Sequence, residues 1–160
     1  MTLFRSVRDR ARHRSRGQSL AEFAIVFPVL MMIIGGIIQF GVIFWGLNTL
    51  NQVVRDTGRW AATQTDCDPA SAKAPIVSTA NTIAAASNLI GYGPGSITNA
   101  ELTVSWRSDP VGAPCPPLDN QDEAWVAITI QHDVPIFFPF VPGNGQLSAS
   151  TEFRMEPEPQ

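Results

Sequence analysis

Residues 16–45 read RGQSLAEFAIVFPVLMMIIGGIIQFGVIFW, and this stretch decides the fold. From Phe23 to Val54 the chain carries no charged residue. At about 1.5 Å per residue, a helix from Phe23 to Trp45 is long enough to cross a hydrocarbon core of roughly 30 Å. A secretory signal would have a shorter apolar core of about 7–15 residues, followed by an A-x-A site, and residues 48–52 offer no such site. The sequence therefore predicts a retained membrane-spanning helix.

The charges on the two sides of this stretch have opposite signs. The first sixteen residues hold six of the eleven basic residues and one aspartate, whereas the remainder holds five basic and thirteen acidic residues. Basic residues next to a span hold that end in the cytoplasm, so the C-terminal side is expected outside it. An acidic body argues against a nucleic-acid partner. We expect an inner-membrane protein with a cytoplasmic leader (1–17), a transmembrane helix (18–47) and a periplasmic α+β domain (48–160).

Beyond Trp45 the pattern becomes amphipathic. Apolar residues recur at spacings of three and four, which is typical of a helix with one buried face. Residues 18–62 are therefore predicted to form one helix that leaves the membrane and continues as a stalk. Pro28 lies inside the span, where a proline is tolerated because neighbouring groups satisfy the freed carbonyl. The stalk face consists of Leu47, Leu50, Val53, Val54, Thr57, Trp60 and Ala61.

The rest of the chain predicts a second helix and three strands. Residues 71–90 have one apolar face at helical spacing. Three later runs, 102–106, 126–131 and 147–155, alternate apolar and polar residues with the period of a half-buried strand. The expected fold class is α+β, in which the long N-terminal helix and the second helix pack on a small antiparallel sheet of about three strands.

The junction between leader and helix carries the most specific motif. A basic leader ends in Arg16-Gly17, Gln18 follows, Glu22 is the fifth residue after the glycine, and Phe23 begins the apolar run. This resembles the processing site of type IV prepilins of the Tad (Flp) class and, more widely, the TadE/TadG-like pseudopilins. The likeness extends to Phe40-Gly41 and to residues 55–62, and the run 150–156 is similar to the family's final strand. Phe23 stands where the major pilins usually carry Tyr, which favours a minor pseudopilin.

The resemblance implies that the α+β fold is pilin-like and that the protein functions in assembly. It implies cleavage after Gly17 by a prepilin peptidase, with Arg16, Gly17, Gln18, Glu22 and Phe23 as the processing site. It also implies other Tad pilins and pseudopilins, and an inner-membrane assembly platform, as partners in adhesion or secretion by a type IV pilus-like machine. Whether such a protein enters the fibre or stays in a basal complex is left open.

Glu22 has a physical interpretation that is independent of the family. A carboxylate at the start of an apolar helix needs a positive partner once it leaves water. Cleavage creates one, the α-amino group of Gln18, and pairing with a neighbouring subunit would fix the stagger between subunits. The alternative is an interfacial acid wetted by headgroups. Gly35, Gly36 and Gly41 are predicted to let another helix approach closely.

Further candidate sites are few. Cys67 and Cys115 both follow the span, in a compartment where disulfides persist, so a Cys67–Cys115 bond is predicted; two buried thiols are the alternative. His13 and His132 have no metal-ligand spacing, and Asp119, Asp122 and Glu123 lack the order of a calcium loop. The sequence thus predicts no metal, no cofactor, no catalytic residue and no enzyme.

Two other functions remain open. The chain could be a membrane-tethered periplasmic binding module with an uncleaved anchor, or an enzyme with an unrecognised site. The apolar, proline-rich segment 137–143 also has two interpretations, an exposed contact loop or a loop packed against the membrane-proximal stalk.

Overall fold

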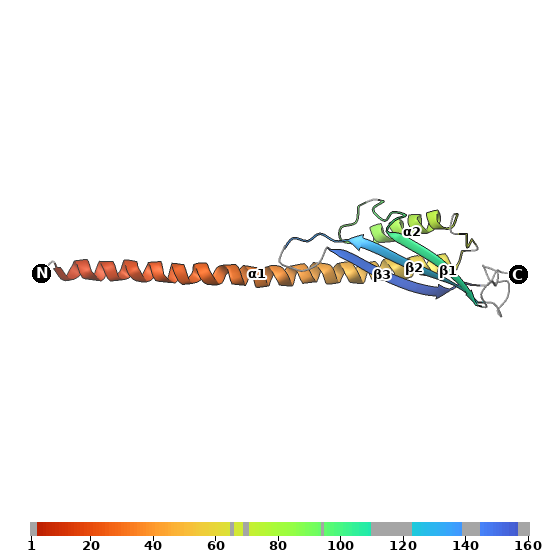
Figure 1. Cartoon of the computed structure of the whole chain (residues 1–160). Helices are drawn as coiled ribbons and strands as arrows, with labels where there is room; N and C mark the ends of the chain where they lie inside the picture. Colours follow the sequence, from red (N-terminus) through yellow and green to blue (C-terminus); the bar gives the residue numbers. More distant parts are fainter. Residues whose placement is uncertain are drawn as a thin grey trace.

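The computed structural model describes residues 3–64, 66–68, 71–93, 95–109, 123–138 and 145–156, and for residues 3–17 the backbone alone. Five elements follow one another: α1 (Leu3–Ala62), α2 (Lys73–Ala86), β1 (Leu102–Asp109), β2 (Glu123–Asp133) and β3 (Gln146–Arg154). Figure 1 shows α1 as a long rod whose N-terminal part extends far beyond a small domain built around its other end. The predicted α+β fold is confirmed.

Helix α1 is continuous over 60 residues and runs through Pro28 without interruption. The helix begins at Leu3 and not at the predicted residue 18, so the described part of the basic leader is helical as well. The helix ends at Ala62, where Thr63 N–H donates to the Trp60 carbonyl in a closing turn. Helix α2 is shorter than the predicted 71–90, because Asn88 adopts a left-handed φ of +52° that a helix cannot continue.

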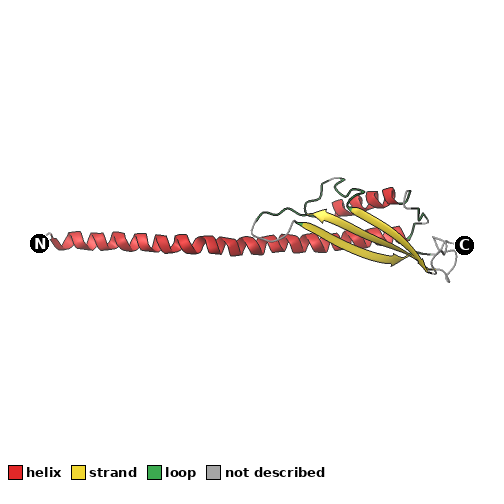
Figure 2. Cartoon of the chain, viewed as in Figure 1, coloured by secondary structure: helices red, strands yellow, loops and turns green. Residues whose placement is uncertain are grey.

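The three strands form one antiparallel sheet in the order β1-β2-β3 (Figure 2). Ile128 at the centre of β2 faces Val104 on β1 and Thr151 on β3. The alternation predicted for β2 is confirmed, since Val126, Ile128 and Ile130 are fully buried. The sheet is therefore one-sided, with one face turned to the helices.

The core lies between the sheet and the C-terminal part of α1. This part of α1 contacts β2, β3 and α2. At Gly58 the helix approaches β3 so closely that a Cβ atom would come within 2.7 Å of the Phe153 ring and 2.9 Å of Thr151 Cγ2. The glycine thus sets the distance between helix and sheet. The buried residues that α1 and α2 supply include Leu50, Val53, Val54, Ala61, Ile76, Ala80 and Ala84.

Candidate functional site

The N-terminal part of α1 extends beyond the domain and is exposed to its surroundings (Figure 1). Every residue from 18 to 34 is exposed. Of the helices described, α1 from Gln18 to Ala62 is the one long and apolar enough to cross a membrane. Apolar side chains exposed around a whole helix require burial outside the chain, in lipid or against other helices. The large exposed ones include Leu20, Phe23, Ile25, Val26, Phe27, Leu30 and Ile33.

Glu22 lies at the start of this apolar segment. Its Oε1 accepts a hydrogen bond of 3.2 Å from Gln18 Nε2, one helical turn earlier, and both residues are exposed. The rings of Phe23 and Phe27 contact each other on the next turn, with centroids 5.3 Å apart and planes tilted by 34°. Among the side chains described from Gln18 onward, Glu22 thus has a neutral amide as its partner and forms no ion pair. Arg16 and Gly17 lie in α1, outside the described side chains.

The three glycines singled out by sequence do not share one environment. A Cβ atom at Gly35 would lie within 2.5 Å of the Phe138 ring, so this glycine is buried under a residue of its own chain. Gly36 and Gly41 have no atom within 4 Å of such a Cβ position. The space beside Gly35 is therefore filled by Phe138 of the same chain, whereas the space beside Gly36 and Gly41 is open to a neighbouring helix.

Gln39 is a site residue that sequence reasoning missed. Its side chain is fully buried although it lies in the apolar segment. Nε2 donates to the Pro135 carbonyl at 3.2 Å, and Oε1 accepts from the Phe137 N–H at 2.8 Å. The described part of the proline-rich segment thus packs against α1, while residues 139–143 lie outside the description. The sequence feature that could have indicated Gln39 is its isolation, because it is an amide in an otherwise apolar run between Glu22 and Asn48.

The region from the leader junction to the stalk also matches a known family. Residues 17–59 match the family model described as TadE-like protein. This TadE-like segment covers less than a third of the chain. The match begins at Gly17, where cleavage was predicted, and ends one turn before α1 does, so it includes none of the sheet. No curated protein and no solved structure matches the chain.

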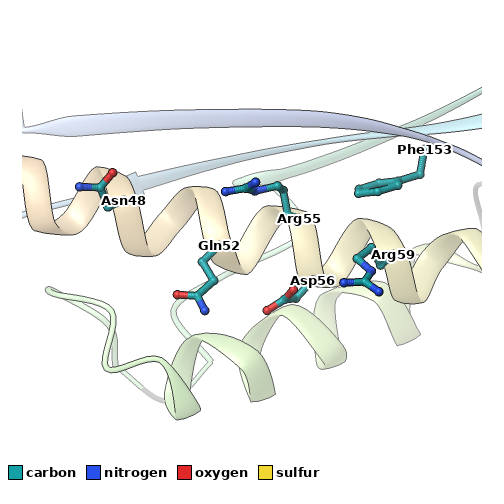
Figure 3. Close-up of a pocket in the computed structure, with 6 residues that line it drawn as sticks. All are labelled: Asn48, Gln52, Arg55, Asp56, Arg59 and Phe153. Carbon is teal, nitrogen blue, oxygen red and sulfur yellow. The ribbon is translucent and has the colours of Figure 1, made fainter.

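The TadE-like segment also carries a polar groove on its stalk. Asn48, Gln52, Arg55, Asp56 and Arg59 line it together with Phe153 from β3. Figure 3 shows them along α1, with Gln52, Asp56 and Arg59 on one side and Arg55 toward the strands. The two ion pairs found among described residues are Arg107–Glu152 and Arg154–Glu123, so neither Arg55 nor Arg59 takes part in one.

The turn after α1 holds the first cysteine. Asp66 Oδ1 accepts from Asp68 N–H at 2.9 Å, and a hydrogen bond from Ser71, together with this backbone bond, lowers the pKa of Asp66. Cys67 is half-buried, is not a free thiol, and places its Sγ 3.6 Å from Met155 Sδ. Cys115 lies outside the described residues, so the Cys67–Cys115 bond stays a prediction.

The remaining titratable candidates have structural partners. His132 is buried, with Nε2 3.0 Å from the Ile90 carbonyl oxygen, and Glu123 pairs with Arg154 at 3.3 Å. No group of three or more metal-ligating side chains occurs among the described residues. His13, Asp119 and Asp122 lie outside the described side chains. The prediction that the chain is not an enzyme is tested by none of these observations and stays a prediction.

Proposed function

We propose that this TadE-like chain is a minor pilin-like component of a Tad/Flp-type pilus assembly, a structural protein and not an enzyme. In this proposal α1 anchors it in the inner membrane, with the leader in the cytoplasm and the α+β domain in the periplasm. A prepilin peptidase cleaves after Gly17, and the chain then assembles through its N-terminal helix. The observation that carries the proposal is the apolar part of α1, which is exposed at every residue from 18 to 34 and lies within the TadE-like match.

The exposed surface fits helix packing in a membrane. Between apolar helices in lipid, association depends on close packing, and glycines allow the backbones to approach. Gly36 and Gly41 have open space where a side chain would stand. We propose that other Tad pilins and pseudopilins, and the assembly platform, pack there.

Glu22 would supply the registry of assembly. In the single chain its carboxylate is exposed and bonded to the neutral Gln18 side chain. Cleavage converts Gln18 into the first residue, with a positive α-amino group. In a membrane-embedded assembly, a neighbour's amine that reaches Glu22 satisfies both charges, and only one stagger between subunits allows this.

The mature N-terminus tests the proposal. Mass spectrometry of the protein from its own membrane should give Gln18 as the first residue. Gly17→Leu should block cleavage, because a bulky side chain obstructs the peptidase at the scissile bond, whereas Gly17→Ala should be cut at least partly. A protein that still begins at Met1 in cells with an active peptidase would contradict the proposal.

The polar groove supports a second candidate, a membrane-tethered binding module with an uncleaved anchor. Arg55 and Arg59 are exposed and could receive an acidic ligand. This candidate predicts an intact leader and normal function after Glu22→Ala. It also predicts that Arg55→Ala with Arg59→Ala abolishes function without affecting pilus assembly.

A further inference from the structure

The segment from Val134 to Phe138 leaves the sheet and returns to the apolar part of α1. Figure 1 shows β2 pointing back toward the N-terminal part of the helix, so the chain leaves the domain on its membrane side. Two contacts fix the segment there. Gln39 bonds to Pro135 and Phe137, and the Phe138 ring lies over Gly35, one turn closer to the leader.

The level of this contact follows from helix geometry. A hydrocarbon core of roughly 30 Å that begins at Phe23 ends about 20 residues later, near Ile43. Gln39 then lies about 6 Å below that boundary, and Gly35 about one turn deeper. The residues of α1 around Gln39 are apolar and exposed, among them Ile37, Ile38 and Phe40.

Three polar backbone groups of the segment have hydrogen-bond partners within the described protein. Non-helical backbone is tolerated at membrane depth only where its polar groups are satisfied by protein. The Gln39 amide satisfies the Pro135 carbonyl and the Phe137 N–H at once, and Val134 N–H donates to Gly145 O at 2.8 Å. Pro135 has no N–H to satisfy.

The outward side of the segment is apolar. The side chain of Phe137 is 63% exposed and that of Ile136 is 36% exposed. No charged residue occurs between Asp133 and Glu152. Ile136 and Phe137 extend the exposed apolar surface of α1 at the level of Gln39. Whatever covers this part of α1 should therefore cover these two side chains as well.

We propose that the segment Val134–Phe138 enters the outer leaflet of the membrane and holds the periplasmic domain at a fixed height and rotation on α1. Its outward contact is lipid, with Phe137 among the acyl chains just below the headgroups, at the level of Gln39. The anchor would then have two apolar elements, a spanning helix and a shallow loop. This inference requires that α1 spans the membrane but does not require cleavage or assembly.

Nitroxide labels on single cysteines in the full chain test the inference. The chain is reconstituted at low protein-to-lipid ratio in phosphatidylcholine–phosphatidylglycerol vesicles, and collisions with oxygen and with a water-soluble nickel chelate are measured. Phe137→Cys is compared with Ile25→Cys as the lipid reference and Ser78→Cys as the water reference; all three native side chains are exposed. The unsubstituted chain, labelled in parallel, gives the background from Cys67 and Cys115.

The label at Phe137 should resemble that at Ile25, with frequent oxygen and rare nickel collisions. Frequent nickel collisions, as at Ser78, would overturn the inference because the segment would lie in water. Protection from both reagents would also overturn it, since protein and not lipid would then cover Phe137. Frequent nickel collisions at Ile25 would instead show that α1 does not span the membrane. The Ile25 label therefore distinguishes a wrong anchor from a wrong placement of the Val134–Phe138 segment.

Discussion

The two parts of α1 present their apolar side chains to different surroundings. From residue 18 to 34 every residue of the helix is exposed, whereas Leu50, Val53, Val54 and Ala61 are buried in the core with the sheet and α2. One part has its apolar surface distributed around the helix, and the other has it on one face. The first part therefore needs lipid or other helices to bury its apolar side chains, whereas the second part buries them in the protein's own core.

The boundary between the two parts is a zone of several turns. Gly35 and Gln39 contact the loop after β2, and at Gly46 a Cβ atom would lie 3.0 Å from Val134 Cγ1. The domain thus contacts α1 well inside the predicted span of residues 18–47. Mutations should consequently fall into two classes, those that change the stability of the domain and those that change anchoring or assembly.

The largest stability effect should come from the predicted Cys67–Cys115 disulfide, which acts on the domain alone. Closing a loop of 48 positions lowers the entropy of the unfolded chain by an amount equivalent to roughly 4 kcal/mol at 25 °C. Reduction should lower the free energy of unfolding of the domain by about that amount, and leave the helix content of the anchor unchanged. Thiol labelling of the unfolded, unreduced protein should give no signal; two reactive thiols would refute the bond.

A matched pair of leucines on α1 should separate the two parts directly. Leu50 is fully buried, while Leu30 is 45% exposed. Leu50→Ala should cost about 3 kcal/mol of domain stability because it leaves a cavity in the core. Leu30→Ala should change domain stability by less than about 0.5 kcal/mol. Denaturant unfolding in detergent, followed by tryptophan fluorescence, measures both, and equal effects would show that the division of α1 is wrong.

Two glycines offer the same contrast on a smaller scale. Gly58→Ala places a Cβ atom within 2.7 Å of the Phe153 ring, and such overpacking costs about 1–3 kcal/mol, more than the roughly 1 kcal/mol that alanine gains in a helix. Gly36→Ala meets no atom within 4 Å, so the domain should keep its stability. Its effect should be on assembly instead. A stabilised Gly58→Ala variant would mean that Phe153 moves aside without cost.

The smallest expected effect concerns Thr57. Its hydroxyl oxygen is buried and has no hydrogen-bond partner among the described residues. Thr57→Val keeps the shape and removes an unsatisfied polar atom, so it should raise the unfolding free energy by about 1 kcal/mol. Thr57→Ser, which keeps the hydroxyl and loses the methyl group, is the control and should lower it. Destabilisation by Thr57→Val would show that the hydroxyl has a partner.

Most of the fold could be predicted from sequence because its signals are periodic. The apolar run gave the long helix, and alternation gave three strands whose buried residues, such as Val126 and Ile130, are those expected. The end of the long helix at residue 62 was predicted correctly, whereas α2 is shorter than predicted, because its end depends on a single backbone angle, that of Asn88. The antiparallel sheet of three strands followed from the strand count, but its register did not.

The site could be predicted only where the motif is local. Glu22 and Gln18 lie one turn apart, so their spacing is visible in the sequence. The contacts of Gln39 and Gly35 join residues almost a hundred positions apart, and no local pattern reveals such pairs. An isolated glutamine in an apolar run was the one available signal.

The central claim is that the N-terminal part of α1 acts in assembly, and Glu22 tests it most directly. In a complementation assay for pilus formation, with membrane abundance measured in parallel, Glu22→Ala should insert normally but fail to assemble. Loss of one member of a buried ion pair costs on the order of 3–5 kcal/mol, enough to reject a subunit. Glu22→Asp should be intermediate, and Glu156→Ala, which removes an exposed acid of the domain, should assemble normally. Normal pili from Glu22→Ala at normal protein level would contradict the account.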